Sequence, residues 1–72
     1  ARNLAESISI ESGELLELFQ WNATPTPDRL ADELADVAIY CLCLANAAGL
    51  DLGTAIQSKI SSNAVKYPVT NA

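Results

Sequence analysis

Two pairs of acidic side chains share one spacing in this sequence. Glu11 and Glu14 lie in the segment IESGELLEL, and Glu33 and Asp36 lie in DELAD. Residues three apart are neighbours on the surface of an α-helix, so each segment places two carboxylates side by side if it is helical. Carboxylates grouped in this way can bind a hard metal ion or take a proton from a reacting group.

The first pair stands where a hydrophobic core is expected. At about 100° per residue, the position of Glu11 falls within the arc of the apolar side chains of its own helix. A buried carboxylate without a partner costs several kcal/mol, so Glu11 needs either a proton or a cation. The apolar side chains of that arc are Leu4, Ile8, Leu15, Leu18 and Phe19.

A divalent metal ion is the cation that the composition favours. The chain has only four Lys and Arg residues for nine Asp and Glu residues, too few to neutralise the acids by ion pairs. Mg²⁺ accepts oxygen ligands from several carboxylates at once, and Mn²⁺ shares this preference. We therefore predict a Mg²⁺ site, with Mn²⁺ as the alternative, whose ligands are Glu11, Glu14, Glu33 and Asp36.

The other metal chemistries lack their ligands. The sequence has no histidine, which excludes the Glu-x-x-His pairs of carboxylate-bridged di-iron bundles and argues against a zinc site. Cys41 and Cys43 point in nearly opposite directions on a helix, so they cannot form a disulfide with each other and are expected to pack in the core. The acids expected in solvent are Glu6, Glu17, Asp28 and Asp32.

Polar and aromatic residues that could bind a ligand lie nearby in the sequence. Lys59, Asn63 and Lys66 share one face of a predicted helix, with Tyr67 at its end, where they could contact phosphate oxygens or simply form a solvated face. Tyr40 lies one turn beyond Asp36 and could reach the same pocket or belong to the core. Trp21 and Phe19 could each stack on a base, and packing is the alternative role of both.

Three helices are predicted, over about Asn3–Gln20, Asp28–Ala48 and Leu52–Lys66. Thr26 can cap the second helix and Asp51 the third, and Pro27 suits the first helical position. Gly49 fits the left-handed turn that ends the second helix, and Pro68 ends the third. The sequence has no useful period-two alternation, so we predict one all-α domain over residues 1–72, with a trimmed N-terminus as an open alternative.

The second helix has too much apolar surface for one chain to cover. The segment VAIYCLCLA, residues 37–45, carries no charge, so this half of the helix is apolar around its whole circumference and must be covered on every side. Two neighbouring helices of a 72-residue chain cannot do this. We predict a helical bundle that is completed by oligomerisation.

The overall composition excludes several classes of partner. A net charge of −5 repels a phosphate backbone, so a nucleic acid polymer is not an expected partner. No run reaches the roughly 18 apolar residues of a membrane span, and no signal peptide is visible. The absence of a disulfide framework favours a reducing compartment, and we predict a cytoplasmic protein without a membrane partner.

At these residues the chain resembles a known family. The segments IESGELLELFQW, DELADVAIYCLCLA and KISSNAVKYP are similar to those of the MazG-like nucleotide pyrophosphohydrolases, which belong to the all-α NTP pyrophosphatase superfamily. The family's signature is Glu-x-x-Glu on one helix and Glu-x-x-Asp on the next, and the four predicted ligands match it. The resemblance extends from about Asn3 to Pro68.

The resemblance implies a Mg²⁺-dependent enzyme that hydrolyses a nucleoside triphosphate to the monophosphate and pyrophosphate, as a homodimer or homotetramer. The FQW segment is similar to the dCTP pyrophosphatase-like subgroup; it implies stacking by Trp21 and leaves Phe19 in the core. The KYP segment implies phosphate contacts by Lys59, Asn63, Lys66 and Tyr67. Glu14 is the assumed general base. Family members usually carry a further N-terminal segment that helps to close the base pocket. If that segment is absent in nature, base selectivity is in doubt, and if it was merely trimmed, the present chain is a core with reduced activity.

Two other functions remain open at this point. The chain could be a non-enzymatic helical oligomerisation module whose acids only solvate its surface. It could also be a related all-α enzyme that acts on another phosphorylated ligand, such as phosphoribosyl-ATP. Pyrophosphate release and Mg²⁺-dependent melting would separate the enzyme from the module, and a substrate panel would separate the two enzymes.

Overall fold

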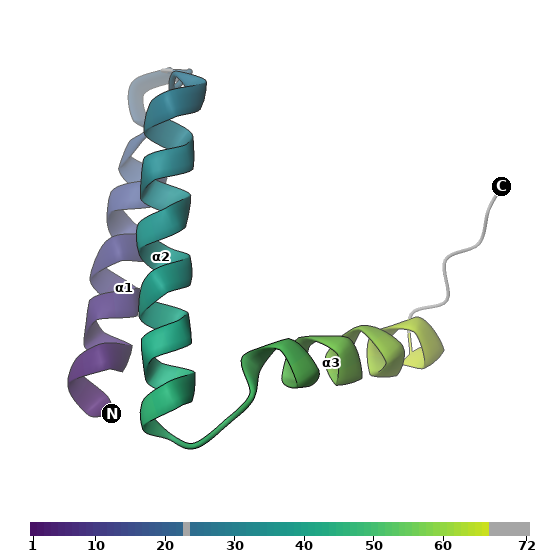
Figure 1. The fold of residues 1–72 in the computed structure, drawn as a ribbon. Coiled ribbons are helices and arrows are strands. Elements are labelled where there is room, and N and C mark those ends of the chain that lie inside the picture. Colours follow the sequence, from purple (N-terminus) through teal and green to yellow (C-terminus); the bar gives the residue numbers. More distant parts are fainter. Residues whose placement is uncertain (23, 67–72) are drawn as a thin grey trace, which may run out of the picture.

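The fold is entirely helical in the part of the chain that the computed structural model describes, residues 1–22 and 24–66. It consists of α1 (Arg2–Glu17), the short 3₁₀ turn η1 (Gln20–Asn22), α2 (Pro27–Ala47) and α3 (Leu52–Lys66). The two longest helices, α1 and α2, lie side by side and antiparallel, whereas α3 points away from them (Figure 1). The prediction of an all-α fold is confirmed.

The start of α2 is fixed by the residues that the sequence indicated. The Thr26 hydroxyl accepts a hydrogen bond from the backbone N–H of Arg29 at 3.3 Å, and Pro27 occupies the first helical position. Both features satisfy or remove N–H groups that would otherwise have no partner at a helix start. Asp28 adds a negative charge in the first turn, where the helix dipole favours it.

The end of α2 is a Schellman motif built on Gly49. This glycine has a φ of 71°, a left-handed conformation that residues with a Cβ rarely adopt. The backbone N–H of Leu50 bonds the carbonyl of Ala45 at 2.8 Å, and the N–H of Gly49 bonds that of Asn46 at 3.1 Å. These bonds satisfy the last carbonyls of the helix, and the turn releases the chain in a new direction.

The third helix begins at once and leaves the hairpin. The Asp51 carboxylate accepts a hydrogen bond from the N–H of Thr54 at 3.0 Å and caps α3. The axis of α3 makes an angle of 104° with that of α2, and the helix extends away from the α1–α2 hairpin (Figure 1). Apolar side chains of α3 are therefore exposed, including Ile56, Ile60 and Val65.

The core of a single chain is very small. Among the described residues, only Leu18 and Ala45 are buried apolar side chains. The accessible surface is 5913 Å², whereas a compact protein of this mass exposes about 4,300 Å². The radius of gyration of 15.3 Å likewise exceeds the roughly 11 Å of a compact chain of this length. One chain alone does not enclose a normal hydrophobic core.

The first helix is shorter than predicted, and one aromatic side chain is not in the core. The helix ends at Glu17 rather than Gln20 because the N–H groups of Leu18 and Phe19 bond carbonyls three residues back, as in a 3₁₀ turn. Phe19 is 51 % exposed, so the expectation that it packs in the core is wrong for the single chain. No glycine or proline marks this helix end in the sequence.

No single helix of the described residues is long and apolar enough to cross a membrane. The helices α2 and α3 meet the criteria of length and composition only when they are taken together, across their bend of 104°.

Candidate functional site

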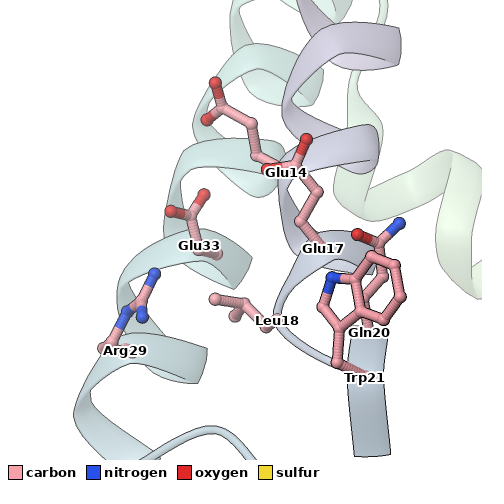
Figure 2. Close-up of a pocket in the computed structure, with 7 residues that line it drawn as sticks. All are labelled: Glu14, Glu17, Leu18, Gln20, Trp21, Arg29 and Glu33. Atoms are coloured by element: carbon pink, nitrogen blue, oxygen red, sulfur yellow. The ribbon is translucent and has the colours of Figure 1, made fainter. Parts of the chain in front are cut away.

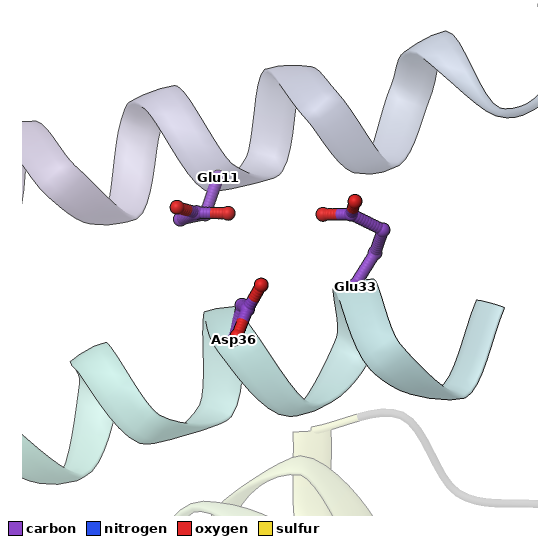
Figure 3. A group of neighbouring side chains, drawn as sticks. All are labelled: Glu11, Glu33 and Asp36. Carbon is purple, nitrogen blue, oxygen red and sulfur yellow. The ribbon is translucent and has the colours of Figure 1, made fainter. Parts of the chain in front are cut away.

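Three of the predicted metal ligands come together between α1 and α2. Glu11 extends from α1, and Glu33 and Asp36 extend from α2 into the space between the two helices (Figure 3). One carboxylate oxygen from each residue lies within 4.8 Å of the others, and all three side chains are half-buried. Because α1 and α2 are antiparallel neighbours, acids far apart in the sequence meet at one level of the hairpin.

Two carboxylate oxygens at this site lack the partners that burial normally requires. Oε2 of Glu11 and Oε2 of Glu33 each expose less than 1 Å² and have no hydrogen-bond partner among the described residues. Buried polar atoms of this kind are uncommon and call for an explanation, such as an ion that the side chains can bind. Orphaned oxygens of clustered carboxylates suit a divalent cation, so the chemistry of the donor set fits the predicted group.

The local electrostatics oppose the charged form of Glu11. Burial raises the pKa of this carboxyl, and the nearby Glu14 carboxyl raises it further because a protonated Glu11 can hydrogen-bond to it. The negative charges of Glu14, Asp36 and Glu33 add to the same shift in pKa. Without a cation, this site therefore disfavours the charged form of Glu11 relative to a carboxylate in water.

Glu33 responds to the same environment with one difference. Burial raises its pKa first, followed by the negative charges of Glu14, Asp36 and Asp32. The positive charge of Arg29 acts in the opposite direction and lowers it. Arg29 lies four residues before Glu33, one turn away on the same side of α2. The effect of its charge on the pKa of Glu33 indicates that Arg29 belongs to the site.

Glu14, the fourth predicted ligand, lies beside the three rather than among them. It is exposed, and it is not one of the residues whose oxygens lie within 4.8 Å of one another. Its charge still acts on both Glu11 and Glu33. Glu14 also borders an open pocket next to the acid cluster, where its carboxylate can take a proton from a bound molecule.

That pocket has a volume of about 380 Å³ and lies between the end of α1 and the start of α2. Figure 2 shows Leu18 at its centre, with Trp21 and Arg29 on opposite sides. A volume of this size suits a small ligand. The pocket is lined by Glu14, Glu17, Leu18, Gln20, Trp21, Arg29 and Glu33.

Trp21 is displayed on the surface in an unusual backbone conformation. Its φ and ψ are 63° and 29°, and its side chain is 94 % exposed. A left-handed conformation is rare for a bulky residue and costs about 1–3 kcal/mol. Trp21 therefore does not anchor the core of its own chain. Its position fits stacking on a ligand, and the predicted packing role fits only if the partner is another chain.

Four of the remaining predicted ligand contacts, all among the described residues, do not line the pocket of their own chain. Tyr40 is half-buried on α2, one turn beyond Asp36, and does not line the pocket. Lys59, Asn63 and Lys66 are on α3, which points away from the hairpin (Figure 1). Tyr67 lies outside the described residues.

Four residues that line the pocket have no ligand-binding role predicted from the sequence. The sequence predicts Leu18 in the core and Glu17 in solvent, and it predicts no role for Gln20 or Arg29. The spacing of Arg29 from Glu33, four residues on one helix, could have indicated that they share a face. The position of Gln20 could not be predicted, because it depends on the turn that replaces the last part of the expected first helix.

Comparison with known proteins gives relatives over nearly the whole chain. The dCTP pyrophosphatase 1 of Rattus norvegicus is 42 % identical over 78 residues, and that of Homo sapiens is 39 % identical over 77 residues. A pyrophosphatase of Archaeoglobus fulgidus with a solved crystal structure has a TM-score of 0.78 and 40 % identity. That match covers 94 % of this chain and 71 % of the archaeal one.

The chain spans less than half the length of the curated relatives that it matches. The alignment with the rat enzyme covers 94 % of this chain and 46 % of the relative, and the human values are 93 % and 45 %. The MazG-like family matches over residues 6–72, a range that includes both acidic pairs, most of α1 and the whole of α2 and α3. By this match, the chain belongs to the MazG-like family.

Proposed function

We propose that this chain is the catalytic part of a divalent-metal-dependent nucleoside triphosphate pyrophosphohydrolase that prefers dCTP-like nucleotides. The observation that carries the proposal is the acid cluster of Glu11, Glu33 and Asp36, with two buried oxygens that have no partner among the described residues. In a member of the MazG-like family, such a cluster is better explained by a bound cation than by solvated surface acids.

Glu11, Glu33 and Asp36 would hold the cation, which we take to be Mg²⁺ or Mn²⁺, with Glu14 completing the set from the edge of the pocket. When bound, such an ion neutralises phosphate charge and makes a nearby water more acidic. Phosphoryl transfer needs little covalent help from a protein beyond charge neutralisation and alignment. By holding the cation, the four carboxylates on two helices would provide both charge neutralisation and alignment.

Glu14 is the proposed general base. Its carboxylate borders the pocket beside the cluster, so it can accept the proton of a water that attacks the α-phosphorus of a bound nucleotide. The bond between the α-phosphorus and the oxygen leading to the β-phosphorus then breaks. The nucleoside monophosphate and pyrophosphate are the products, and the proton remains on Glu14 until solvent removes it.

The preference for dCTP-like nucleotides is proposed from the relatives named dCTP pyrophosphatase 1 and from Trp21. An exposed indole on one wall of the pocket can stack on a base, an interaction that contributes about 1–3 kcal/mol in other nucleotide-binding proteins. We further propose that Tyr40, Lys59, Asn63, Lys66 and Tyr67 bind the same substrate. Because α3 leaves its own hairpin (Figure 1), its residues would do so from a neighbouring copy.

A homodimer or homotetramer is the proposed functional form. The accessible surface of 5913 Å² exceeds that of a compact protein of this mass by about 1,600 Å². Each partner in a standard interface buries roughly 800 Å², so the surplus is large enough for more than one interface. Exposed apolar side chains lie on both α2 and α3, among them Ile39, Leu42 and Ile60.

The proposal is tested by incubating the protein with a panel of deoxynucleoside triphosphates and phosphoribosyl-ATP, with Mg²⁺ and with excess chelator. Pyrophosphate should form from dCTP or a close analogue in Mg²⁺ and should not form in chelator. The matched variants Asp36→Asn and Asp32→Asn make the same change one turn apart on α2, and only the first removes a proposed ligand. Asp36→Asn should abolish product, whereas Asp32→Asn should retain most activity.

The competing functions predict different results. A helical oligomerisation module would release no pyrophosphate from any substrate and would melt at the same temperature with and without Mg²⁺. An enzyme for another phosphorylated ligand would cleave phosphoribosyl-ATP but not dCTP. Equal activity of the Asp36→Asn and Asp32→Asn variants would contradict the proposed role of the acid cluster. The cytoplasmic location stays a prediction from the sequence.

A further inference from the structure

Arg29 occupies a position that the proposed function has not used. It lies in the first turn of α2, exposed to solvent, and lines the pocket together with Glu14, Glu17 and Glu33. Among the described residues that line this pocket, it is the one basic side chain. In Figure 2 its guanidinium group extends along α2 toward Glu33.

The guanidinium group of Arg29 forms no ion pair or hydrogen bond with the described residues. The hydrogen bond at Thr26 uses the backbone N–H of Arg29 and leaves its side chain unused. The other arginine, Arg2, is different, because its Nε lies 3.3 Å from a Glu6 oxygen and its side chain is 92 % exposed. Arg29 is thus a cation at an acidic pocket whose donors remain available to a ligand.

We propose that Arg29 binds the phosphates that leave as pyrophosphate, and that it thereby selects nucleoside triphosphates over monophosphates. This inference rests on the proposed function of the same site. A guanidinium group presents paired N–H donors that match the oxygens of a phosphate group, and such charge-assisted contacts are among the strongest hydrogen bonds in proteins. The five donors of Arg29 would act one helical turn from the nearest proposed metal ligand, Glu33.

The charge of the pocket explains why a cation is needed there. Three of its lining residues, Glu14, Glu17 and Glu33, are acidic, and their charges would repel the outer phosphates of a nucleotide. A cation held by the acid cluster neutralises charge near Glu11 and Asp36, but Glu17 lies outside that cluster. Arg29 supplies positive charge at this end of the pocket.

The shape of the pocket favours the phosphate chain over the base as the partner of Arg29. Trp21 and Arg29 lie on opposite sides of Leu18 (Figure 2). A nucleotide whose base rests on the Trp21 indole, with its scissile linkage near Glu14 and Glu33, directs its outer phosphates toward the other wall. The described structure puts Arg29 on that wall, whereas Lys59 is on the departing α3.

The test measures binding of three ligands that differ only in their phosphates: dCMP, dCDP and the non-hydrolysable α,β-methylene analogue of dCTP. Calorimetry in Mg²⁺ compares the full chain with its Arg29→Ala, Arg29→Lys and Arg2→Ala variants. Arg29→Ala should raise the Kd of the triphosphate analogue about 10-fold or more. The Kd of dCMP should change by less than about twofold. Arg29→Lys keeps the charge but not the paired donors, so its Kd for the triphosphate analogue should fall between the values of the wild type and Arg29→Ala.

The controls separate this inference from the proposed function. Arg2→Ala removes an arginine outside the pocket and should bind all three ligands like the wild type. Unchanged thermal melting of Arg29→Ala would exclude misfolding as the cause. If Arg29→Ala loses the same affinity for dCMP as for the triphosphate analogue, or loses affinity for neither, the assignment of Arg29 is overturned. This holds even if the wild type hydrolyses dCTP. A wild type that binds the analogue but releases no pyrophosphate refutes the proposed function and leaves the binding result on Arg29 intact.

Discussion

Glu11 of α1 and Glu33 of α2 face each other across the helical hairpin, and each holds a carboxylate oxygen that is shielded from solvent and has no hydrogen-bond partner among the described residues. The hairpin brings these acids together at the level where two apolar helix faces meet. Their pKa values are both raised by burial first and by the neighbouring negative charges second. Closure of the hairpin without a cation is therefore opposed by its own side chains.

Mg²⁺ should stabilise this protein strongly. A ligand that binds only the folded state at a hundred times its Kd contributes about 2.7 kcal/mol, and each kcal/mol raises Tm by about 4–8 °C in a domain of this size. Thermal melting by circular dichroism in chelator and in excess Mg²⁺ measures the difference. We expect Glu11→Gln to lose most of the Mg²⁺-dependent shift in Tm, since it removes a charged carboxylate, a proposed ligand, from the cluster.

The same Glu11→Gln variant should have the opposite effect without metal. A neutral amide carries no charge into the acid cluster, so the variant should melt at a higher temperature than the wild type in chelator. Glu6→Gln is the matched control on the same helix, because Glu6 is exposed and its ion pair is with Arg2, outside the acid cluster. If Glu11→Gln and Glu6→Gln melt alike in both conditions, Glu11 is an ordinary surface acid.

Acidification should stabilise the metal-free protein relative to the Glu11→Gln variant. The folded-state pKa of Glu11 and of Glu33 lies above the ordinary value of 4.5, so the folded state keeps protons that the unfolded state has lost. The charge penalty is full above the raised pKa, falls as the pH drops through it, and is gone below 4.5. Melting in chelator between neutral pH and pH 4.5 measures this trend.

Mg²⁺-saturated protein should respond to pH in the reverse direction. Protons compete with the cation for the carboxylates, so the stabilisation by Mg²⁺ should decrease as the pH falls through the raised pKa values. The two curves should approach each other toward low pH. Parallel curves with and without Mg²⁺ would mean that the ion binds somewhere other than these acids.

The local sequence signals predicted the helices well, because capping chemistry acts over a few residues. Thr26, Gly49 and Asp51 behave as expected, and α3 has the predicted bounds. The acid cluster was predictable because the three-residue spacing fixes which helix face bears the acids. The direction of α3 and the conformation of Trp21 were not, because both depend on turns whose geometry no single residue specifies.

Replacing Trp21 by glycine should separate its backbone role from its side-chain role. Glycine adopts the φ of 63° without strain, so Trp21→Gly should not reduce stability and could increase it by up to about 1 kcal/mol. The variant should lose discrimination among bases, seen as similar KM values for dCTP and the other deoxynucleoside triphosphates. Trp21→Phe keeps an aromatic face and should retain part of the preference. Unaltered selectivity in Trp21→Gly would show that the indole does not read the base.

Two glycine-to-alanine changes should shift stability in opposite directions. Gly49→Ala puts a Cβ on a residue with a φ of 71°, which costs about 1–2 kcal/mol and weakens the turn into α3. Gly13→Ala changes a residue within α1 whose added Cβ meets no atom within 4 Å, and better helix propensity should contribute about 0.5–1 kcal/mol. Denaturant titration measures both. A loss of stability in Gly13→Ala would mean that another chain packs against this face of α1.

A charged substitution on the outer side of α2 should dissociate the proposed oligomer. Leu42 is 57 % exposed within the single chain, and an arginine there would have to be buried unpaired if a second copy covers that side. Leu42→Arg should sediment as a smaller species than the wild type and melt at a lower temperature, because one chain encloses little core of its own. Ser12→Arg offers a control that replaces an exposed polar side chain on α1. If Leu42→Arg sediments with the wild type, the exposed apolar side of α2 is not an interface between copies.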